Sequence, residues 1–273
     1  VGLVISTGSD INEFETGDRV AFIGAAYAEY TVVDASKCFR IPAGSTPEEV
    51  LALRVSGLTA IVALERTAKV QASDTVLVTA ACGATGSFAV QLAKLAGAKV
   101  IGTVGSEYKV KIAHDLGCDR VVNYRQEDLH AVLQTEFPDG IDVVYEGVGG
   151  MLFRAAHDNL AEGGRILLVG AISTYPHNLN PSHHGIPGIP DLMEVFRAGE
   201  TRDLGGGRQL IGNVWGDAFS SGALVGARQR LLELYVAGEI RSLLDKEAFS
   251  GVESIPDAVD YMLSGSSVGK VWV

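Results

Sequence analysis

The sequence is poor in three features: paired cysteines, long apolar runs and positive charge. Its three cysteines, Cys38, Cys82 and Cys118, form no CxxC motif, which favours a reducing compartment over secretion. No apolar run reaches the roughly 18 residues that a membrane span needs, so no span is predicted. The formal net charge of −11 disfavours a nucleic-acid partner, because phosphate backbones are bound by clustered Lys and Arg.

The start of the sequence also lacks an initiator methionine and a signal-like segment. Val1 opens directly onto a strand-like run, "VGLVIS". We therefore expect a processed or truncated intracellular chain, either cytoplasmic or mitochondrial, in which any targeting segment is missing from view.

Apolar residues and glycine are abundant. Of the 273 residues, 47% are hydrophobic and 33 are glycine, which suits a packed core in one large or two modest domains with many tight turns. Residues 1–45 contain three short β-rich runs, "VGLVIS", "DRVAFIG" and "AEYTVVD". These runs predict strands of a small β-barrel, or half of one.

From Thr46 onward, strand-like and helix-like segments alternate. Thr46 is a candidate N-cap, and Pro47 occupies the first helical position. The apolar strands are continuous, which indicates burial on both faces and predicts a doubly wound parallel α/β sheet. We predict helices over 86–96, 106–116, 126–135, 150–160 and 222–238, a loop over 175–206, a sixth strand over 208–215, and a tail with a short helix and a closing strand.

A glycine-rich turn follows the first strand of this alternation. The stretch "TAACGATGSFAVQLAKLAG", Thr79–Gly97, has the spacing of the dinucleotide fingerprint G-x-G-x-x-G, with Ala81 at the first glycine. Gly83 would let the backbone approach a pyrophosphate, and Gly86 would let the helix pack closely on the strand. A close-packed turn without a ligand is the alternative. Cys82 is interpreted as a small packing residue, because no histidine lies near it in the sequence to activate a thiol.

The end of the second strand bears on which nucleotide would bind. An NAD site usually has a carboxylate there, whereas this stretch ends in Gly105 and Ser106. The Ser106 hydroxyl and the Lys109 ammonium are donors suited to a 2′-phosphate, and Tyr124 ends the neighbouring strand. The site is therefore predicted to be of the NADP type. Two alternatives remain: Ser106 is only an N-cap and Lys109 only a solvated residue, or Glu107 marks an NAD site.

Several motifs together resemble one family. "AACGATGSFAVQLAKLAGAKVIGTVGSEYK", "CDRVVNY", "YEGVGG", "GRILLVGAISTY" and "SVGKVWV" resemble the medium-chain dehydrogenase/reductase superfamily, and within it the zinc-independent quinone oxidoreductases and prostaglandin (alkenal/one) reductases. The resemblance implies a Rossmann domain with a partial GroES-like β-barrel, in which the N-terminal part of the catalytic domain is missing. It divides the chain into residues 1–45 (GroES-like), 46–238 (NADP-binding) and 239–273 (a segment returning to the catalytic domain).

The same resemblance implies roles for individual residues. Tyr175 and Thr59 would be the catalytic candidates, with Thr59 facing the nicotinamide. The NADP-binding residues would be Gly83, Ala84, Thr85 and Gly86 at the pyrophosphate; Ser106, Lys109 and Tyr124 at the 2′-phosphate; Gly147, Gly170, Ala171, Ile172 and Ser173 around the nicotinamide ribose; and Asn213 and Ser267. Ser267 stands where the family usually has Asn.

No metal site is expected. Zinc alcohol dehydrogenases carry a four-cysteine lobe where this chain has only "AFIGAAYA". Their third catalytic zinc ligand would fall at Leu53, Arg54 or Val55, none of which binds zinc. His183 and His184 are interpreted as solvated loop residues.

The resemblance implies hydride transfer from NADPH to an α,β-unsaturated ketone or aldehyde, including 15-oxo-prostaglandins and alkenals, or to a quinone. A different class stays open: a reductase-derived, catalytically degenerate subunit of a larger assembly. A homodimer through the strand 209–214 is the expected partner arrangement, with such an assembly as the alternative.

Overall fold

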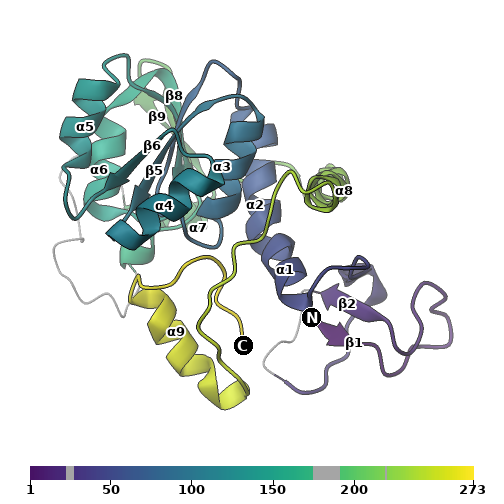
Figure 1. Cartoon of the computed structure of the whole chain (residues 1–273). Helices are drawn as coiled ribbons and strands as arrows, with labels where there is room; N and C mark the ends of the chain where they lie inside the picture. The colour runs from purple at the N-terminus through teal and green to yellow at the C-terminus, as the bar shows by residue number, and fades with distance from the viewer. Residues whose placement is uncertain (23–27, 175–190, 219) are drawn as a thin grey trace.

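The computed structural model describes residues 1–22, 28–174, 191–218 and 220–273. It contains a small sheet near the N-terminus and a large sheet, joined by a long helical stretch (Figure 1). The small sheet is antiparallel and consists of β1 (Gly2–Leu3), β2 (Arg19–Phe22) and β3 (Cys38–Arg40).

The large sheet has seven strands in the order β6-β5-β4-β7-β8-β10-β9. Six strands run parallel, and β9 is antiparallel to β10. The order confirms the predicted doubly wound fold, because the chain winds outward from β4 in one direction and from β7 in the other. The strands are β4 (Thr75–Val78), β5 (Lys99–Val104), β6 (Arg120–Asn123), β7 (Ile141–Glu146), β8 (Leu160–Leu168), β9 (Thr201–Gly205) and β10 (Arg208–Ile211).

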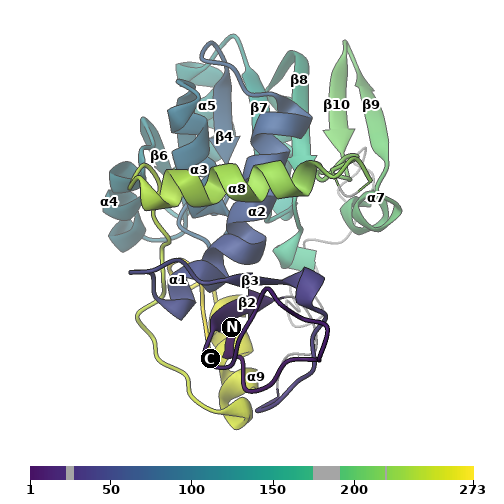
Figure 2. The ribbon, with the colours of Figure 1, turned by 90° about the vertical axis from the view of Figure 1, so that its right-hand side faces the viewer.

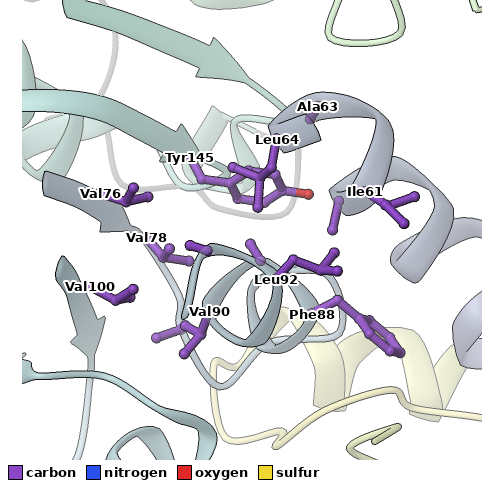
Figure 3. Packing of buried hydrophobic residues seen from close by; sticks show 14 of the residues in the cluster. Ile61, Ala63, Leu64, Val76, Val78, Phe88, Val90, Leu92, Val100 and Tyr145 are labelled. Carbon is purple, nitrogen blue, oxygen red and sulfur yellow. The ribbon is translucent and has the colours of Figure 1, made fainter. Parts of the chain in front are cut away.

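Helices cover both faces of the large sheet, because successive strand residues point to opposite sides. In β4, Val76 and Val78 join one buried cluster and Leu77 joins the other. The first cluster lies under α2 (Leu58–Ile61), α3 (Gly86–Leu95), α4 (Glu107–Leu116) and α8 (Ala223–Val236), and Figure 3 shows it with the Tyr145 ring beside Leu64. The second lies under α5 (Leu129–Glu136), α6 (Gly150–Asp158) and α7 (Leu192–Ala198).

The helical stretch between the sheets begins where the sequence predicts. The Thr46 hydroxyl accepts the Glu49 N–H, and the Glu49 carboxylate accepts the Thr46 N–H, a complete capping box with Pro47 in the first turn. The stretch comprises α1 (Pro47–Ala52), α2 and two π-helical segments, Leu53–Gly57 and Val62–Ala68. It connects the small sheet to β4, an inner strand of the large sheet.

The C-terminal part returns across the molecule. Figure 2 shows α8 lying across the face formed by α2 and α3. Helix α9 (Ile255–Leu263) lies at the same end of the molecule as the small sheet but apart from it (Figure 1). In place of the predicted closing strand, Gly269 and Lys270 form isolated parallel bridges with Gly83 and Leu244. None of the helices among the described residues has the length and apolar content needed to cross a membrane.

The predicted strand "AEYTVVD" is wrong. Residues 28–34 form no strand, and the partner of β2 is β3, a few residues later. Tyr30 and Val32 are 75% and 99% exposed, so β-favouring side chains here find no surface to pack on. Such residues report a fit to a half-buried surface, which this segment lacks.

The predicted loop 175–206 is partly wrong as well, since it contains α7 and β9. Asp191 caps α7 by accepting two backbone N–H groups, and Gly199 ends it in the left-handed conformation. β9 then pairs with β10, so both edges of β10 are occupied, by β8 and β9. The predicted pairing of strand 209–214 with a second copy would therefore have to displace β9, which is the outer strand of this sheet.

Replacing Thr46 by Ala should lower the free energy of unfolding by about 1 kcal/mol, because the Glu49 N–H loses its acceptor at the helix start. Urea denaturation of T46A and of the matched T46S variant measures the effect. T46S keeps a hydroxyl and should stay close to the parent. Equal losses in both variants would show that the methyl group, rather than the cap, matters.

Candidate functional site

The carboxyl ends of β4 and β7 mark the place where the winding direction of the large sheet reverses. β4 pairs with β5 on one side and with β7 on the other. The crossovers after β4 and β7 leave in opposite directions and open a crevice between them, which is where ligands bind in sheets of this kind. Five of the predicted site residues follow these two strands: Gly83, Ala84, Thr85 and Gly86 after β4, and Gly147 after β7.

The glycine-rich turn after β4 is shaped by close contact. The Gly83 N–H donates to the Ala80 carbonyl oxygen at 2.7 Å, and a Cβ at Gly86 would overlap that same oxygen. Among the described residues, the positive φ in this turn falls on Ala80 (50°) rather than on Ala81. Ala81 therefore replaces the first glycine of the fingerprint without a positive φ, and Gly86 is required for space.

The turn presents unused donors to the crevice. In the part of the chain that the structure describes, the backbone N–H groups of Thr85 and Gly86 have no hydrogen-bond partner, whereas Ala84 adjoins the bridge between Gly83 and Gly269. They lie at the N-terminus of the ten-residue helix α3, where the helix dipole favours an anion. Free donors beside a turn that tolerates no side chain fit a pyrophosphate.

Cys82 is a packing residue, as predicted. Its side chain is 2% exposed, and burial raises the pKa of the thiol to about 12. The Sγ–H group donates to the Lys109 carbonyl oxygen at 3.4 Å. A thiol that stays protonated at neutral pH and is closed off from solvent is not a nucleophile.

The ends of β5 and β6 lie side by side, and neither carries a carboxylate. The Tyr124 N–H donates to the Val104 carbonyl oxygen at 3.1 Å, and the Tyr124 hydroxyl occupies the space where Gly105 would carry a Cβ. The Ser106 hydroxyl forms no cap bond at the start of α4. Glu107 begins α4 and is exposed. Two residues that carry hydroxyl groups, Ser106 and Tyr124, therefore follow these strand ends.

Lys109 contacts the C-terminal segment. Its ammonium donates to the carbonyl oxygens of Gly265, at 2.7 Å, and Ser267, at 2.8 Å. Burial lowers the pKa of the ammonium. Two residues further on, the Gly269 N–H donates to the Cys82 carbonyl oxygen at 2.7 Å. Lys109 and Ser267, which were both predicted to bind the cofactor, are thus hydrogen-bonded to each other through the Ser267 carbonyl group.

The loops after β7 and β8 are hydrogen-bonded to each other. The N–H groups of Ile172 and Ser173 donate to the carbonyl oxygens of Gly147 and Val148. Gly147 has open space where a Cβ would stand, whereas Ala171 and Ser173 are buried. The predicted residues Gly147, Gly170, Ala171, Ile172 and Ser173 therefore form one unit at the crevice.

Glu146 is a site residue that the sequence analysis missed. It is fully buried, and its Oε1 accepts the N–H groups of Val148 and Gly149, both at 2.6 Å. Burial raises its pKa to about 7, against the opposing effect of these hydrogen bonds. A carboxylate that ends an apolar strand and precedes glycines was the available signal.

The remaining predicted residues are less closely connected. Thr59 is buried on α2, which packs against α3. Asn213 is exposed, and its amide donates to the Gly216 carbonyl oxygen at 3.2 Å. Tyr175, His183 and His184 lie outside the described residues. Within the described ranges, no group of three or more His, Cys, Asp or Glu side chains is placed to hold a metal ion.

Comparisons with known proteins agree with this geometry. Residues 84–188 match the family model described as zinc-binding dehydrogenase. The chain is 40% identical to mouse prostaglandin reductase-3, over 100% of this chain and 71% of that protein. It is 35% identical to a probable quinone oxidoreductase of Leishmania amazonensis, over 100% and 77%.

Two solved structures superpose on most of this chain. Escherichia coli quinone oxidoreductase complexed with NADPH superposes with a TM-score of 0.76 at 26% identity, over 98% of this chain and 78% of that one. CurA from Vibrio vulnificus in complex with NADPH gives 0.75 at 29% identity, over 94% and 74%.

Glu146→Gln should make the protein more stable than the parent at high pH. The pKa of Glu146 is raised in the folded state, so the folded protein binds the proton more tightly and its stability falls as pH rises from about 4.5 to about 7. Glutamine does not ionise, so E146Q should gain up to about 3 kcal/mol relative to the parent above pH 7. Urea denaturation at several pH values measures this. The exposed-site control Glu107→Gln should follow the parent curve, and a constant difference between E146Q and the parent at all pH values would contradict the assignment.

Proposed function

The chain belongs to the medium-chain dehydrogenase/reductase superfamily, among the quinone oxidoreductases and prostaglandin reductases, and we propose that it is an NADPH-dependent reductase. Its substrates would be the conjugated C=C bonds of α,β-unsaturated ketones and aldehydes, such as 15-oxo-prostaglandins and alkenals, or quinones. The names of its relatives support both substrate classes.

The observation that carries the proposal is the turn after β4, where the free N–H groups of Thr85 and Gly86 lie at the switch point. A pyrophosphate bound there would direct one end of a dinucleotide towards β5 and β6 and the other towards β7 and β8. NADPH is bound in two of the similar solved structures. The absence of a carboxylate at Gly105 and Ser106 supports NADPH over NADH.

When bound, NADPH would supply the hydride that reduces the β-carbon of the substrate, and the α-carbon would take its proton from water or an acid. The protein's contribution is position. Ser106 and Tyr124 would hold the phosphate end, with Lys109 beside them. The unit of Gly147 and residues 170–173 would shape the nicotinamide end, and Thr59 on α2 would face the nicotinamide. Tyr175 and Asn213 complete the proposed set, together with Ser267.

Three further features belong to the proposal. Catalysis would need no zinc. Residues 1–45 would be part of a GroES-like domain, residues 46–238 the NADP-binding domain and residues 239–273 a returning segment. The protein would form a homodimer, and β9 rather than β10 offers the open sheet edge.

One observation favours the second hypothesis, a subunit of a larger assembly. A hollow of about 850 Å³ lies within residues 1–38, far along the chain from the glycine-rich turn. Leu3, Ile5 and Val32 around it are 61%, 63% and 99% exposed, which is an apolar surface suited to a partner.

The protein should oxidise NADPH in the presence of an alkenal, a 15-oxo-prostaglandin or a quinone, and a metal chelator should leave the rate unchanged. Absorbance at the NADPH band gives the rate, and product analysis shows whether the C=C bond is reduced. Tight NADPH binding without turnover of any of the three substrates would overturn the enzyme proposal and favour the subunit. A rate abolished by the chelator and restored by zinc would overturn its metal independence.

A further inference from the structure

Glu146 ends β7, and its carboxylate fixes the loop that follows. Its Oε1 accepts the N–H groups of Val148 and Gly149, both at 2.6 Å. The side chain is fully buried, so water does not compete for these hydrogen bonds. Gly149 has a φ of 84° and no space for a side chain, because a Cβ there would lie 2.8 Å from Ser173 Oγ. The position of one carboxylate oxygen therefore sets the direction of two N–H groups in a tightly packed loop.

The opposite edge of this loop holds the loop after β8. The Gly147 carbonyl oxygen accepts the Ile172 N–H at 3.1 Å, and the Val148 carbonyl oxygen accepts the Ser173 N–H at 3.0 Å. The loop after β7 thus turns N–H groups towards Glu146 and carbonyl groups towards the loop after β8. A displacement of the carboxylate would be transmitted through these peptide groups to Ile172 and Ser173.

The Thr79 hydroxyl fixes the start of the loop after β7 from the other side. Its Oγ1 accepts the Gly147 N–H at 2.9 Å and donates to the Tyr145 carbonyl oxygen at 3.3 Å. Thr79 is 2% exposed and comes directly after β4, where the glycine-rich turn begins. It therefore connects that turn to the loop after β7 at the switch point of the sheet.

We propose that Glu146 and Thr79 are positioning residues, which hold the loops after β7 and β8 in the geometry that binds the nicotinamide half of NADPH. The inference rests on the proposed function, in which Gly147 and residues 170–173 shape that end of the site. Both side chains act through the backbone of the loop rather than by touching the reacting atoms. A loop that is already ordered pays no ordering entropy when the cofactor binds, so losing this order weakens binding.

Dissociation constants for NADPH and for 2′,5′-ADP, which lacks the nicotinamide half, test this role by calorimetry on the full chain. E146M removes the acceptor of two buried N–H groups. It should weaken NADPH binding by about 10-fold and leave 2′,5′-ADP binding within about 2-fold of the parent. T79V should act in the same direction, because the Gly147 N–H loses its acceptor. E146Q and T79S keep an acceptor oxygen and should restore the parent's affinity for NADPH.

Asp142 offers a matched control on the same strand. Its Oδ2 accepts the Thr75 N–H at 2.8 Å, at the amino ends of β7 and β4 and so at the far end of these strands from the loops. D142L should lower the stability of the protein, because a backbone N–H loses its acceptor. It should leave both dissociation constants unchanged.

Other results would overturn the positioning role or the function beneath it. If E146M and T79V bind NADPH like the parent, or lose both ligands to the same extent, the positioning role is wrong and the reductase proposal stands. If E146M does not fold, T79V and T79S decide the question alone. If the parent protein binds neither NADPH nor NADH, the proposed function fails, and this inference fails with it.

Discussion

The large sheet depends on β4 having a parallel partner on each side. Its backbone pairs with β5 and with β7, and its side chains supply both buried clusters. The chain winds outward from β4 in one direction and from β7 in the other, so no crossover connection covers the carboxyl end of β4. The glycine-rich turn, the free N–H groups and the loops after β7 and β8 all occupy the opening that this pairing creates.

Features that depend on neighbours in sequence could be predicted. The capping box of Thr46 and Glu49 spans three residues, and the turn from Gly83 to Gly86 lies between a strand and the helix that follows it. Apolar strands indicated burial on both faces, and the seven-stranded order agrees. These elements are specified locally, by caps, by periodicity and by glycine where a Cβ has no room.

Features decided by distant partners could not be predicted. Residues 28–34 have strand-forming side chains but no surface to cover, so β3 pairs instead. The contact of Lys109 with Gly265 could not be foreseen, because the two residues are 156 positions apart in the sequence. The burial of Glu146 was hard to predict, because it follows from the packing of α6 and the loop after β8 rather than from the neighbouring residues in the sequence. Local elements and charged side chains differ in this respect for a physical reason, because the surroundings of a charged side chain are set by the tertiary structure.

The bridge between Gly83 and Gly269 has a consequence for the order in which the protein becomes complete. Strand β4 and helix α3 leave the ribosome long before Gly269 is made. The turn between them therefore passes through synthesis without the segment that Lys109 and Asp245 later hold beside it. Contacts between such distant residues form late, because their loop must close first. The nascent chain would thus form much of its large sheet before residues 265–270 close beside the glycine-rich turn.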